Sequence, residues 1–254
     1  MRPTKTKLMP MEFNGFTLEI NEITRLVFNR PVNVLSTPVV SGLASALAML
    51  RESEVVKALV IAATGPTFLA GADIKEMAAM DELEARRFAE RIHSAMNAIE
   101  SFERPVIAEV QGFCLGGGCE LLLAADLAVA SIEAVFGQPE LDLGIIPGAG
   151  ATQRLKKRIG LIKAKELILT GRRVSAVEAA ELGLINKVAA PGKLQEEVME
   201  LAKLIAAKPG QCVSEAKQLI NDGSLEEEID SFVRMFGYGD QSMLMKSFLT
   251  KGRK

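Results

Sequence analysis

The segment from residue 106 to residue 154 most constrains what this chain can fold into. It contains a short apolar run, Val106–Val110, then a turn, three consecutive glycines at 116–118, and a helix-favouring stretch at residues 120–126. This order predicts a strand, a glycine turn and a helix. Glycine lets a ligand approach the main chain closely, and the first N–H groups of a helix have no partners within it. We therefore expect a site here for an oxygen that carries negative charge.

Two carboxylates accompany this predicted anion site. Glu120 lies in the first turn of the predicted helix, and Glu140 precedes an apolar stretch that continues to Ile146. A carboxyl group in apolar surroundings tends to have a raised pKa, so Glu140 is a candidate acid, although Asp142 competes for that role. Taken alone, Glu120 is better explained as compensation of the helix dipole, and the glycines fit a tight packing turn equally well. Two acids beside one oxyanion site together favour proton transfer.

Other chemistries are disfavoured by the same residues. The glycine segment lacks the Gly-Lys-Ser/Thr of a P-loop and the G-x-G-x-x-G of a dinucleotide site. His93 is the only histidine, on the edge of a predicted amphipathic helix, which argues against a Ser-His-Asp or Cys-His mechanism. We interpret Cys114 and Cys119 as packing residues, since no histidine lies near them in sequence. The cysteine spacing fits neither zinc nor disulfides, so we expect no metal, reduced thiols and a cytoplasmic location.

Composition narrows the class of protein. A chain of 254 residues, 48% of them hydrophobic, can bury a large core as one domain or one and a half. Its net charge of -2 gives no positive field that would attract nucleic acid or an acidic membrane. No apolar run reaches the roughly 20 residues of a membrane span. The basic N-terminus leaves a mitochondrial presequence as an alternative, which its sparse Arg and Ser residues disfavour.

The periodicity elsewhere predicts an alternation of strands and helices. Asn14-Gly15 reads as a hairpin turn at a sheet edge, and Ala58–Ala63 as a strand of a parallel sheet buried on both faces. The small residues before Ile74 resemble the glycine segment, because they too would let a ligand approach the main chain just before a helix. From Lys163 onward we expect helices alone. The last of these carry apolar residues that need another surface, on the chain's own core or on a neighbouring subunit.

Four separate motifs, in this order, resemble the crotonase superfamily, also called the enoyl-CoA hydratase/isomerase family. The resemblance covers nearly the whole chain, from about Phe16 to Lys251, and the combination is highly specific. The motifs are Pro31-Val32-Asn33-Val34-Leu35, residues 68–77 (FLAGADIKEM), residues 112–121 (GFCLGGGCEL), and residues 136–155, which begin FGQPE and end IPGAGATQRL.

The resemblance implies an α/β fold, a crotonase-like spiral of ββα units with a helical C-terminal trimerisation region. It divides the chain into a core at residues 1–190, which holds the active site, and an oligomerisation region at residues 191–254. It also implies a homotrimer or a dimer of trimers, and an acyl-CoA substrate whose coenzyme A is the only cofactor-like group required. Nucleic-acid and membrane partners are not expected.

The same resemblance implies a role for each matched residue. The backbone N–H groups of Ala72 and Gly117 would form the oxyanion hole for a thioester carbonyl, in agreement with the two small-residue loops. Glu120 and Glu140 match the catalytic acids of the hydratases, and Gly148 would offer an N–H near the water. The residues that would bind coenzyme A are Asn33, Val34, Leu35, Ala70, Asp73, Ile74 and Lys251.

Retention of both acids favours a hydratase, because family members with other chemistries typically replace one or both. The implied reaction adds water across the 2,3 double bond of a trans-2-enoyl-CoA to give a 3-hydroxyacyl-CoA. The alternatives are a Δ3-Δ2 enoyl-CoA isomerase or another crotonase-type enzyme with an unusual acyl group, and, in a different class, a non-catalytic or RNA-associated binding protein. Glu109, Gln111 and Ala151 depart from the usual family residues, as does the stretch at 238–243. The sequence leaves the acyl chain and the pathway open.

Overall fold

The computed structural model describes residues 10–251, apart from the side chains of Asp240 and Lys251. Two β-sheets form the centre of the molecule. The larger sheet holds, in spatial order, β1 (Met11–Phe13), β2 (Phe16–Glu19), β3 (Ile23–Phe28), β4 (Ala58–Ala63), β6 (Val106–Val110), β8 (Leu127–Ala130) and β11 (Lys187–Val188). The smaller sheet holds β10 (Val174–Ser175), β9 (Val135–Gly137), β7 (Phe113–Leu115) and β5 (Thr67–Leu69).

The larger sheet begins with the predicted hairpin and continues as the predicted parallel sheet. β1 and β2 are antiparallel with Phe13 opposite Phe16, and Gly15 supplies the positive φ of 88° that the turn requires. From β3 onward, neighbouring strands are parallel. Leu59 and Ile61 of β4 face one hydrophobic cluster, whereas Val60 and Ala62 face a second one on the opposite side. The sheet is therefore buried on both faces, as its continuous apolar strands predict.

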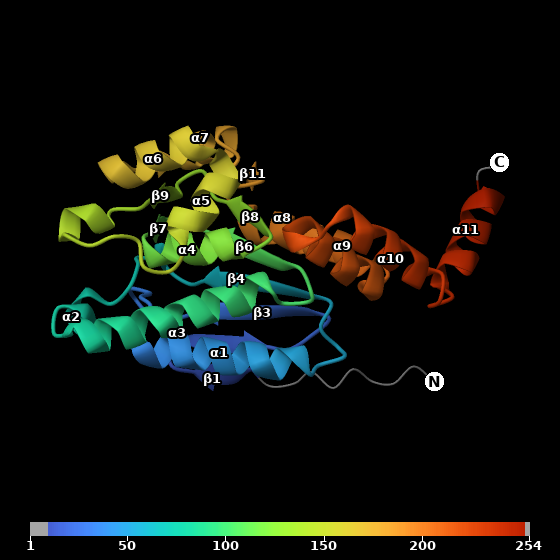
Figure 1. Ribbon diagram of the computed structural model, residues 1–254, viewed down its shortest axis with the longest axis horizontal. Coiled ribbons are helices and arrows are strands. Elements are labelled where there is room, and N and C mark those ends of the chain that lie inside the picture. The colour runs from blue at the N-terminus through green and yellow to red at the C-terminus, as the bar shows by residue number, and fades with distance from the viewer. Residues whose placement is uncertain (1–9, 252–254) are drawn as a thin grey trace.

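Helices cover both faces of this sheet (Figure 1). α1, α3 and α4 pack in the main core on one face, while α8 packs its Val198 and Ala202 against the other. α5, α6 and α7 lie beyond α4, on the side away from α1. The helices are α1 (Thr37–Arg51), α2 (Ile74–Met77), α3 (Glu82–Glu100), α4 (Gly117–Ala124), the 3-10 helix η1 (Glu140–Leu143), α5 (Ala151–Ile159), α6 (Leu161–Thr170), α7 (Ala176–Glu181), α8 (Leu194–Ala206), α9 (Gly210–Asp222), α10 (Leu225–Met235) and α11 (Asp240–Lys251).

The prediction of helices alone after Lys163 was wrong. β10 pairs antiparallel with β9, and β11 pairs parallel with β8, with Lys187 opposite Val129. Each of these strands is two residues long, so neither has an alternation of apolar and polar residues to read. They are strands because sheets formed by earlier segments offer them unpaired edges, which only the tertiary fold creates.

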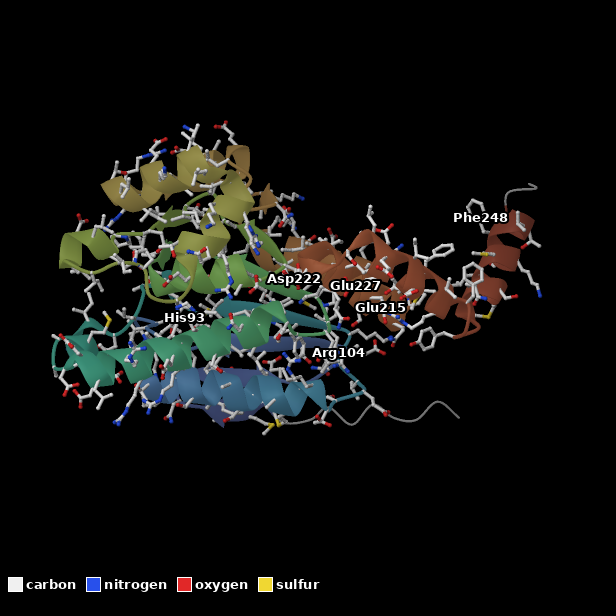
Figure 2. All side chains as sticks on the ribbon, viewed as in Figure 1. His93, Arg104, Glu215, Asp222, Glu227 and Phe248 are labelled. Carbon is white, nitrogen blue, oxygen red and sulfur yellow. The ribbon has the colours of Figure 1, made fainter. Side chains whose placement is uncertain are left out.

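The last three helices form an arm that extends from the body (Figure 1). α9 is attached to the body by an ion pair between Lys217 Nζ and Asp126 Oδ2, 2.7 Å apart. Figure 2 shows Phe248 of α11 at the far end of the arm, where its side chain is 77% exposed. The part expected for residues 191–254 in assembly stays a prediction.

Within residues 10–251, the structure holds no helix that is both long enough and apolar enough to cross a membrane. The cytoplasmic location expected from the cysteines stays a prediction.

Candidate active site

A cavity of about 440 Å³ lies beside the N-terminus of α4. It is bounded by the loop between β5 and α2, by α3, by η1 and by the turn before α5. Much of its wall is apolar, with Met77, Met80, Phe88 and Ile92 on one side and Leu143 of η1 on another. The predicted anion site and both predicted acids thus open into one space that also offers an apolar wall.

The amides of Ala72 and Gly117 are close neighbours at the mouth of α4. A Cβ built on Gly117 would lie 3.3 Å from the nitrogen of Ala72, and one built on Gly71 would lie 3.8 Å from the nitrogen of Gly117. Within the part of the chain that the structure describes, neither N–H has a hydrogen-bond acceptor. Gly117 begins α4, so its N–H has no partner inside the helix. Two unpaired donors side by side suit an oxyanion.

The peptides around Ala72 are held in place by Leu35. The N–H of Leu35 donates to the carbonyl of Gly71 at 2.8 Å, and the N–H of Asp73 donates to the carbonyl of Leu35 at 3.2 Å. These two bonds fix the main chain on both sides of Ala72 and leave its own N–H unused. The donor is therefore oriented in advance, which is the condition for effective stabilisation of developing charge.

Two of the glycines are required by close approaches. Gly116 has φ +50° and ψ −121°, and a Cβ there would lie 2.8 Å from Oε1 of Glu140. A Cβ on Gly118 would lie 2.3 Å from the carbonyl oxygen of Leu69. The glycine segment therefore packs α4 against β5 and, at the same time, brings bare backbone against the carboxylate of Glu140.

Glu120 is 2% exposed and is held by two backbone donors. The N–H of Ala149 donates to its Oε1 at 2.7 Å, and the N–H of Ala151 donates to the same oxygen at 3.0 Å. Burial raises the pKa of the Glu120 carboxyl, while these two donors and the positive charge of Arg154 oppose the rise. Simple compensation of the α4 dipole does not describe this residue, because its carboxylate is bound by another segment.

Glu140 begins η1 and is 8% exposed. Burial, together with a smaller contribution from the negative charge of Glu120, raises the pKa of this carboxyl to about 7. Asp142, its competitor for the role of acid, is exposed and lies next to Gly171 instead. A carboxyl group with a pKa near neutrality can exchange a proton during turnover.

Gln138 is a site residue that the sequence analysis missed. It is 1% exposed, and in the amide orientation that satisfies both groups its nitrogen donates to Oε1 and Oε2 of Glu140 at 3.0 and 3.1 Å. Such donation favours the ionised carboxylate and so opposes the effect of burial. A polar residue two positions before the acid, in an otherwise apolar segment, was the available signal.

The residues expected along coenzyme A fall into different surroundings. Ala70 and Ile74 line the cavity, as does Gly148, which is predicted to lie near the water rather than along coenzyme A. Leu35 is fully buried, and Asn33 is 2% exposed with its amide donating to the carbonyl of Thr67 at 2.9 Å.

The described wall of the cavity includes none of Asn33, Val34, Leu35 and Asp73. Val34 lines a separate surface pocket, together with Asn33. Asp73 caps α2, its carboxylate accepting from the N–H groups of Lys75 and Glu76 at 2.9 and 3.3 Å. The side chain of Lys251 lies outside the described residues. Contact of these residues with coenzyme A stays a prediction.

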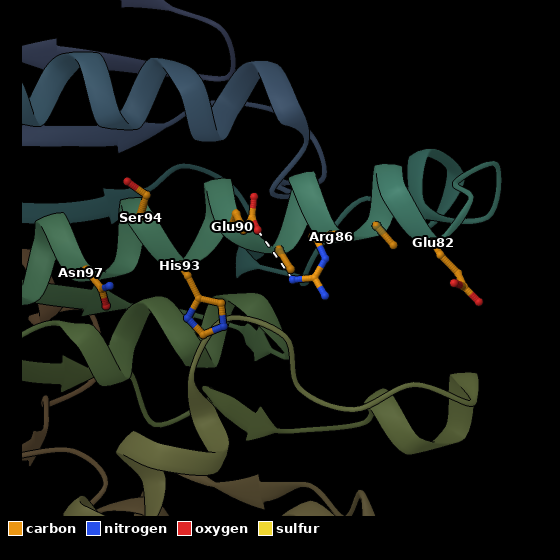
Figure 3. A pocket seen from close by; sticks show the side chains of 8 residues that line it. Glu82, Arg86, Glu90, His93, Ser94 and Asn97 are labelled. Atoms are coloured by element: carbon orange, nitrogen blue, oxygen red, sulfur yellow. Dashed lines mark ion pairs between the residues drawn. The ribbon is translucent and has the colours of Figure 1, made fainter.

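A second, shallower pocket runs along the exposed side of α3 (Figure 3). Figure 3 shows His93 in the same row as Glu90 and Arg86, which form an ion pair at 3.8 Å. This pocket shares Ala85 and Ala89 with the catalytic cavity. His93 is exposed and does not line the catalytic cavity, in keeping with its low rank as a catalytic candidate.

Two departures from the family pattern have structural partners away from the cavity. Glu109 of β6 accepts from Arg25 at 2.8 and 3.1 Å, on the face covered by α8. The amide of Gln111 donates to the carbonyls of Ala63 and Gly65 at 2.6 and 3.3 Å. Both therefore act in the sheet and its loops. In the described residues, no group of three or more His, Cys, Asp and Glu is placed to hold a metal ion.

Comparison with known proteins agrees with this geometry. The sequence model of the family described as enoyl-CoA hydratase/isomerase matches residues 19–251. The chain is 37% identical over 252 residues to the short-chain-enoyl-CoA hydratase of Clostridium acetobutylicum, covering 95% of this chain and 97% of that one. It is 38% identical to the crotonyl-CoA hydratase of Syntrophomonas wolfei, with the same coverage. The crystal structure of an enoyl-CoA hydratase from Bacillus anthracis superposes with a TM-score of 0.90 at 35% identity, covering 94% of this chain and 97% of that one.

The fold and the site together place two buried carboxyl groups and two unpaired backbone amides in one cavity of the described residues. The chain belongs to the enoyl-CoA hydratase/isomerase family, the crotonase family, and an acyl-CoA substrate follows from that membership.

Proposed function

We propose that the protein is an enoyl-CoA hydratase, which adds water to the 2,3 double bond of a trans-2-enoyl-CoA to give the 3-hydroxyacyl-CoA. The observation that carries this proposal is the pair of buried acids, Glu120 and Glu140, in one cavity with two unpaired amides. Two relatives whose names include short-chain-enoyl-CoA and crotonyl-CoA hydratase support a short acyl chain.

In the proposed mechanism, the thioester oxygen accepts hydrogen bonds from the N–H groups of Ala72 and Gly117. Negative charge grows on that oxygen as water adds to C3, so the two donors bind the transition state more strongly than the substrate. By comparison with other oxyanion holes, each fixed donor lowers the barrier by about 3–4 kcal/mol.

The two acids divide the proton transfers. Glu120 accepts the proton of the attacking water, because its two N–H donors and Arg154 favour the charged carboxylate. Glu140 delivers a proton to C2, because burial raises the pKa of its carboxyl to about 7. One proton is taken from water at C3 and one is given at C2, and exchange with solvent resets the pair.

Hydration of crotonyl-CoA by the purified protein is the direct test. We expect loss of the enoyl-thioester absorbance, and we expect Glu140→Gln to lower kcat by about 100-fold or more, since removal of a general acid typically costs this much. Asp142→Asn is the matched control and should leave kcat unchanged, because Asp142 is exposed two positions away. A Glu140→Gln variant at full rate would contradict the role given to this residue.

A second arm of the test separates the hydratase from an isomerase. A 3-enoyl-CoA is offered in place of the 2-enoyl-CoA and the products are identified. A hydratase leaves the 3-enoyl thioester largely unchanged, whereas an isomerase converts it to the 2-enoyl form, which would contradict the proposal if it were the faster reaction.

We also propose that the arm formed by α9, α10 and α11 assembles the protein into homotrimers or dimers of trimers. Large apolar side chains exposed on these helices support this. They are Ile220, Leu225, Ile229, Phe232, Val233, Phe236, Met243, Leu244, Met245, Phe248 and Leu249.

A further inference from the structure

Arg154 connects three elements around the catalytic cavity although it does not line that cavity. It lies on α5, and its side chain is 11% exposed. Its Nε and Nη2 donate to Oε2 of Glu100 at 3.0 and 2.7 Å, and Nη2 also donates to Oδ1 of Asn97 at 2.7 Å. Both partners belong to α3. The guanidinium is thus anchored to α3 by a forked, charge-assisted contact.

The remaining donor of Arg154 is directed at the turn that binds Glu120. Its Nη1 donates to the carbonyl of Ala149 at 3.0 Å, while the N–H of Ala149 donates to Glu120 at 2.7 Å. Gly150 has φ +115°, and a Cβ there would lie 2.1 Å from Nη1 of Arg154. The turn is therefore folded directly against the guanidinium, and a side chain at position 150 would displace it.

The charges around Glu120 come from several elements. Glu140 of η1 is the like charge that interacts with it, and Arg154 of α5 is the opposite charge. Glu100 of α3 forms an ion pair with Arg154 at 2.7 Å. Arg158, one turn further along α5, donates to the carbonyl of Ala125 at 2.6 Å, at the other end of α4.

We propose that Arg154 is a positioning residue for the hydration reaction: held by Glu100 and Asn97, it fixes the turn at 148–151 and so keeps the Glu120 carboxylate oriented and charged. This inference rests on the proposed function. It adds the chain of contacts from α3 through Arg154 and Ala149 to Glu120, by which a residue outside the cavity acts on one inside it. Burial raises the pKa of Glu120, and the positive charge of Arg154 opposes that rise.

The test compares pH–rate profiles of variants at Arg154 and at Glu100, the two ends of their ion pair. Arg154→Gln removes the charge and loosens the turn. We expect kcat to fall about 10- to 100-fold, as for a misplaced catalytic group, with a smaller change in KM. We also expect the acidic limb of kcat/KM to move to higher pH, because the pKa of Glu120 rises when the opposing charge is lost.

For Glu100→Gln we do not expect the acidic limb of kcat/KM to move to higher pH. This substitution removes the negative charge that partly neutralises Arg154, so the acidic limb should stay in place or move to lower pH, while kcat falls less than in Arg154→Gln. Arg154→Lys keeps the charge without the fork, so its acidic limb should stay near that of the wild type while kcat is reduced. A general loss of folding would move all three profiles in the same way.

Arg172→Gln is the matched control. Arg172 also pairs with two glutamates, Glu166 and Glu178, at 2.8 and 2.7 Å, and none of these three residues lines the cavity that holds Glu120. Its removal should leave the profile unchanged. Wild-type kcat and pH profile in Arg154→Gln, or equal shifts in Arg154→Gln and Glu100→Gln, would overturn the inference. If Arg154→Gln does not fold, the inference is judged from the kcat values and pH–rate profiles of Glu100→Gln and Arg154→Lys. An inactive wild type would instead overturn the proposed hydratase function.

Discussion

Glu120 and Glu140 are carboxyl groups of one cavity in different surroundings. Glu120 accepts two backbone N–H bonds and has Arg154 nearby, whereas Glu140 faces the side-chain amide of Gln138 and its own backbone N–H, and within the described residues no such positive charge lowers the pKa of its carboxyl. Burial raises the pKa of both carboxyls, and the donors around each oppose that rise. Unequal surroundings for two interacting carboxyl groups separate a base from an acid.

The raised pKa of Glu140 has a consequence for stability that is independent of the reaction. Its carboxyl titrates near 4.5 when unfolded and near 7 when folded, so the folded state binds the extra proton between these values and stability falls as pH rises through that window. Glu140→Gln removes this penalty. We expect the variant to gain about 1–3 kcal/mol in free energy of unfolding above the window relative to below it, measured by urea denaturation at both pH values.

Asp142→Asn serves as the control, because this side chain is exposed and its removal should leave the pH dependence as it is. Equal pH dependence in wild type and Glu140→Gln would show that Glu140 has no raised pKa in the folded protein.

At the scale of elements, the sequence predicted the features that depend on neighbouring residues. It missed those that depend on contacts between residues far apart in the chain. The strand, glycine turn and α4 follow from one continuous segment. The Ala149 donor to Glu120 comes from 29 residues further on, so nothing near Glu120 indicates it. Capping shows the same limit. The spacing Ser-x-x-Glu at Ser175 and at Ser224 predicts a capping box at the start of a helix in both places. The box at Ser224 is complete. At Ser175 only half of the expected box is present: its hydroxyl caps α7, while the Glu178 carboxylate bonds to Arg172 at 2.7 Å.

The geometry of α3 predicts how activity depends on acyl length. Ala85 and Ala89, one helical turn apart, line both the catalytic cavity and the surface pocket of Figure 3. A large side chain at Ala89 would reduce the space on this side of the cavity. We expect Ala89→Phe to reduce kcat/KM for dec-2-enoyl-CoA by about 10-fold or more while changing crotonyl-CoA little, since steric exclusion affects the longer chain.

Ser94→Phe is the matched control on the same helix, because Ser94 lines the surface pocket and not the catalytic cavity. It should leave the ratio of the two substrates unchanged. An equal loss for both acyl lengths in Ala89→Phe would mean that the acyl group of the longer substrate does not lie against Ala89.

At the scale of the whole molecule, the body and the arm differ in how their apolar residues are used. In the body, two clusters bury the apolar faces of the sheets and helices. In the arm, the ring of Phe232 packs edge-on against that of Phe236 at 5.2 Å, yet the two side chains are 66% and 49% exposed. An apolar surface of this kind typically marks an interface. Sequence indicated the need for a second surface, but it could not indicate which, because helical periodicity does not distinguish a chain's own core from a neighbour's.

The assembly prediction follows from this exposed surface. Phe232→Asp places a charge where an apolar contact is expected, and each fully buried aromatic side chain contributes about 1.5–3 kcal/mol to association. We expect wild type to sediment as a trimer or hexamer and Phe232→Asp to shift toward monomer at the same concentration. Glu228→Lys, a charge change on the same helix at an already charged, exposed position, should keep the wild-type mass. A monomeric wild type, or a Phe232→Asp variant of unchanged mass, would contradict assembly through this surface. Each subunit of the variant would bring one aspartate into the contact, and burial of a charge that has no opposite charge beside it is strongly unfavourable.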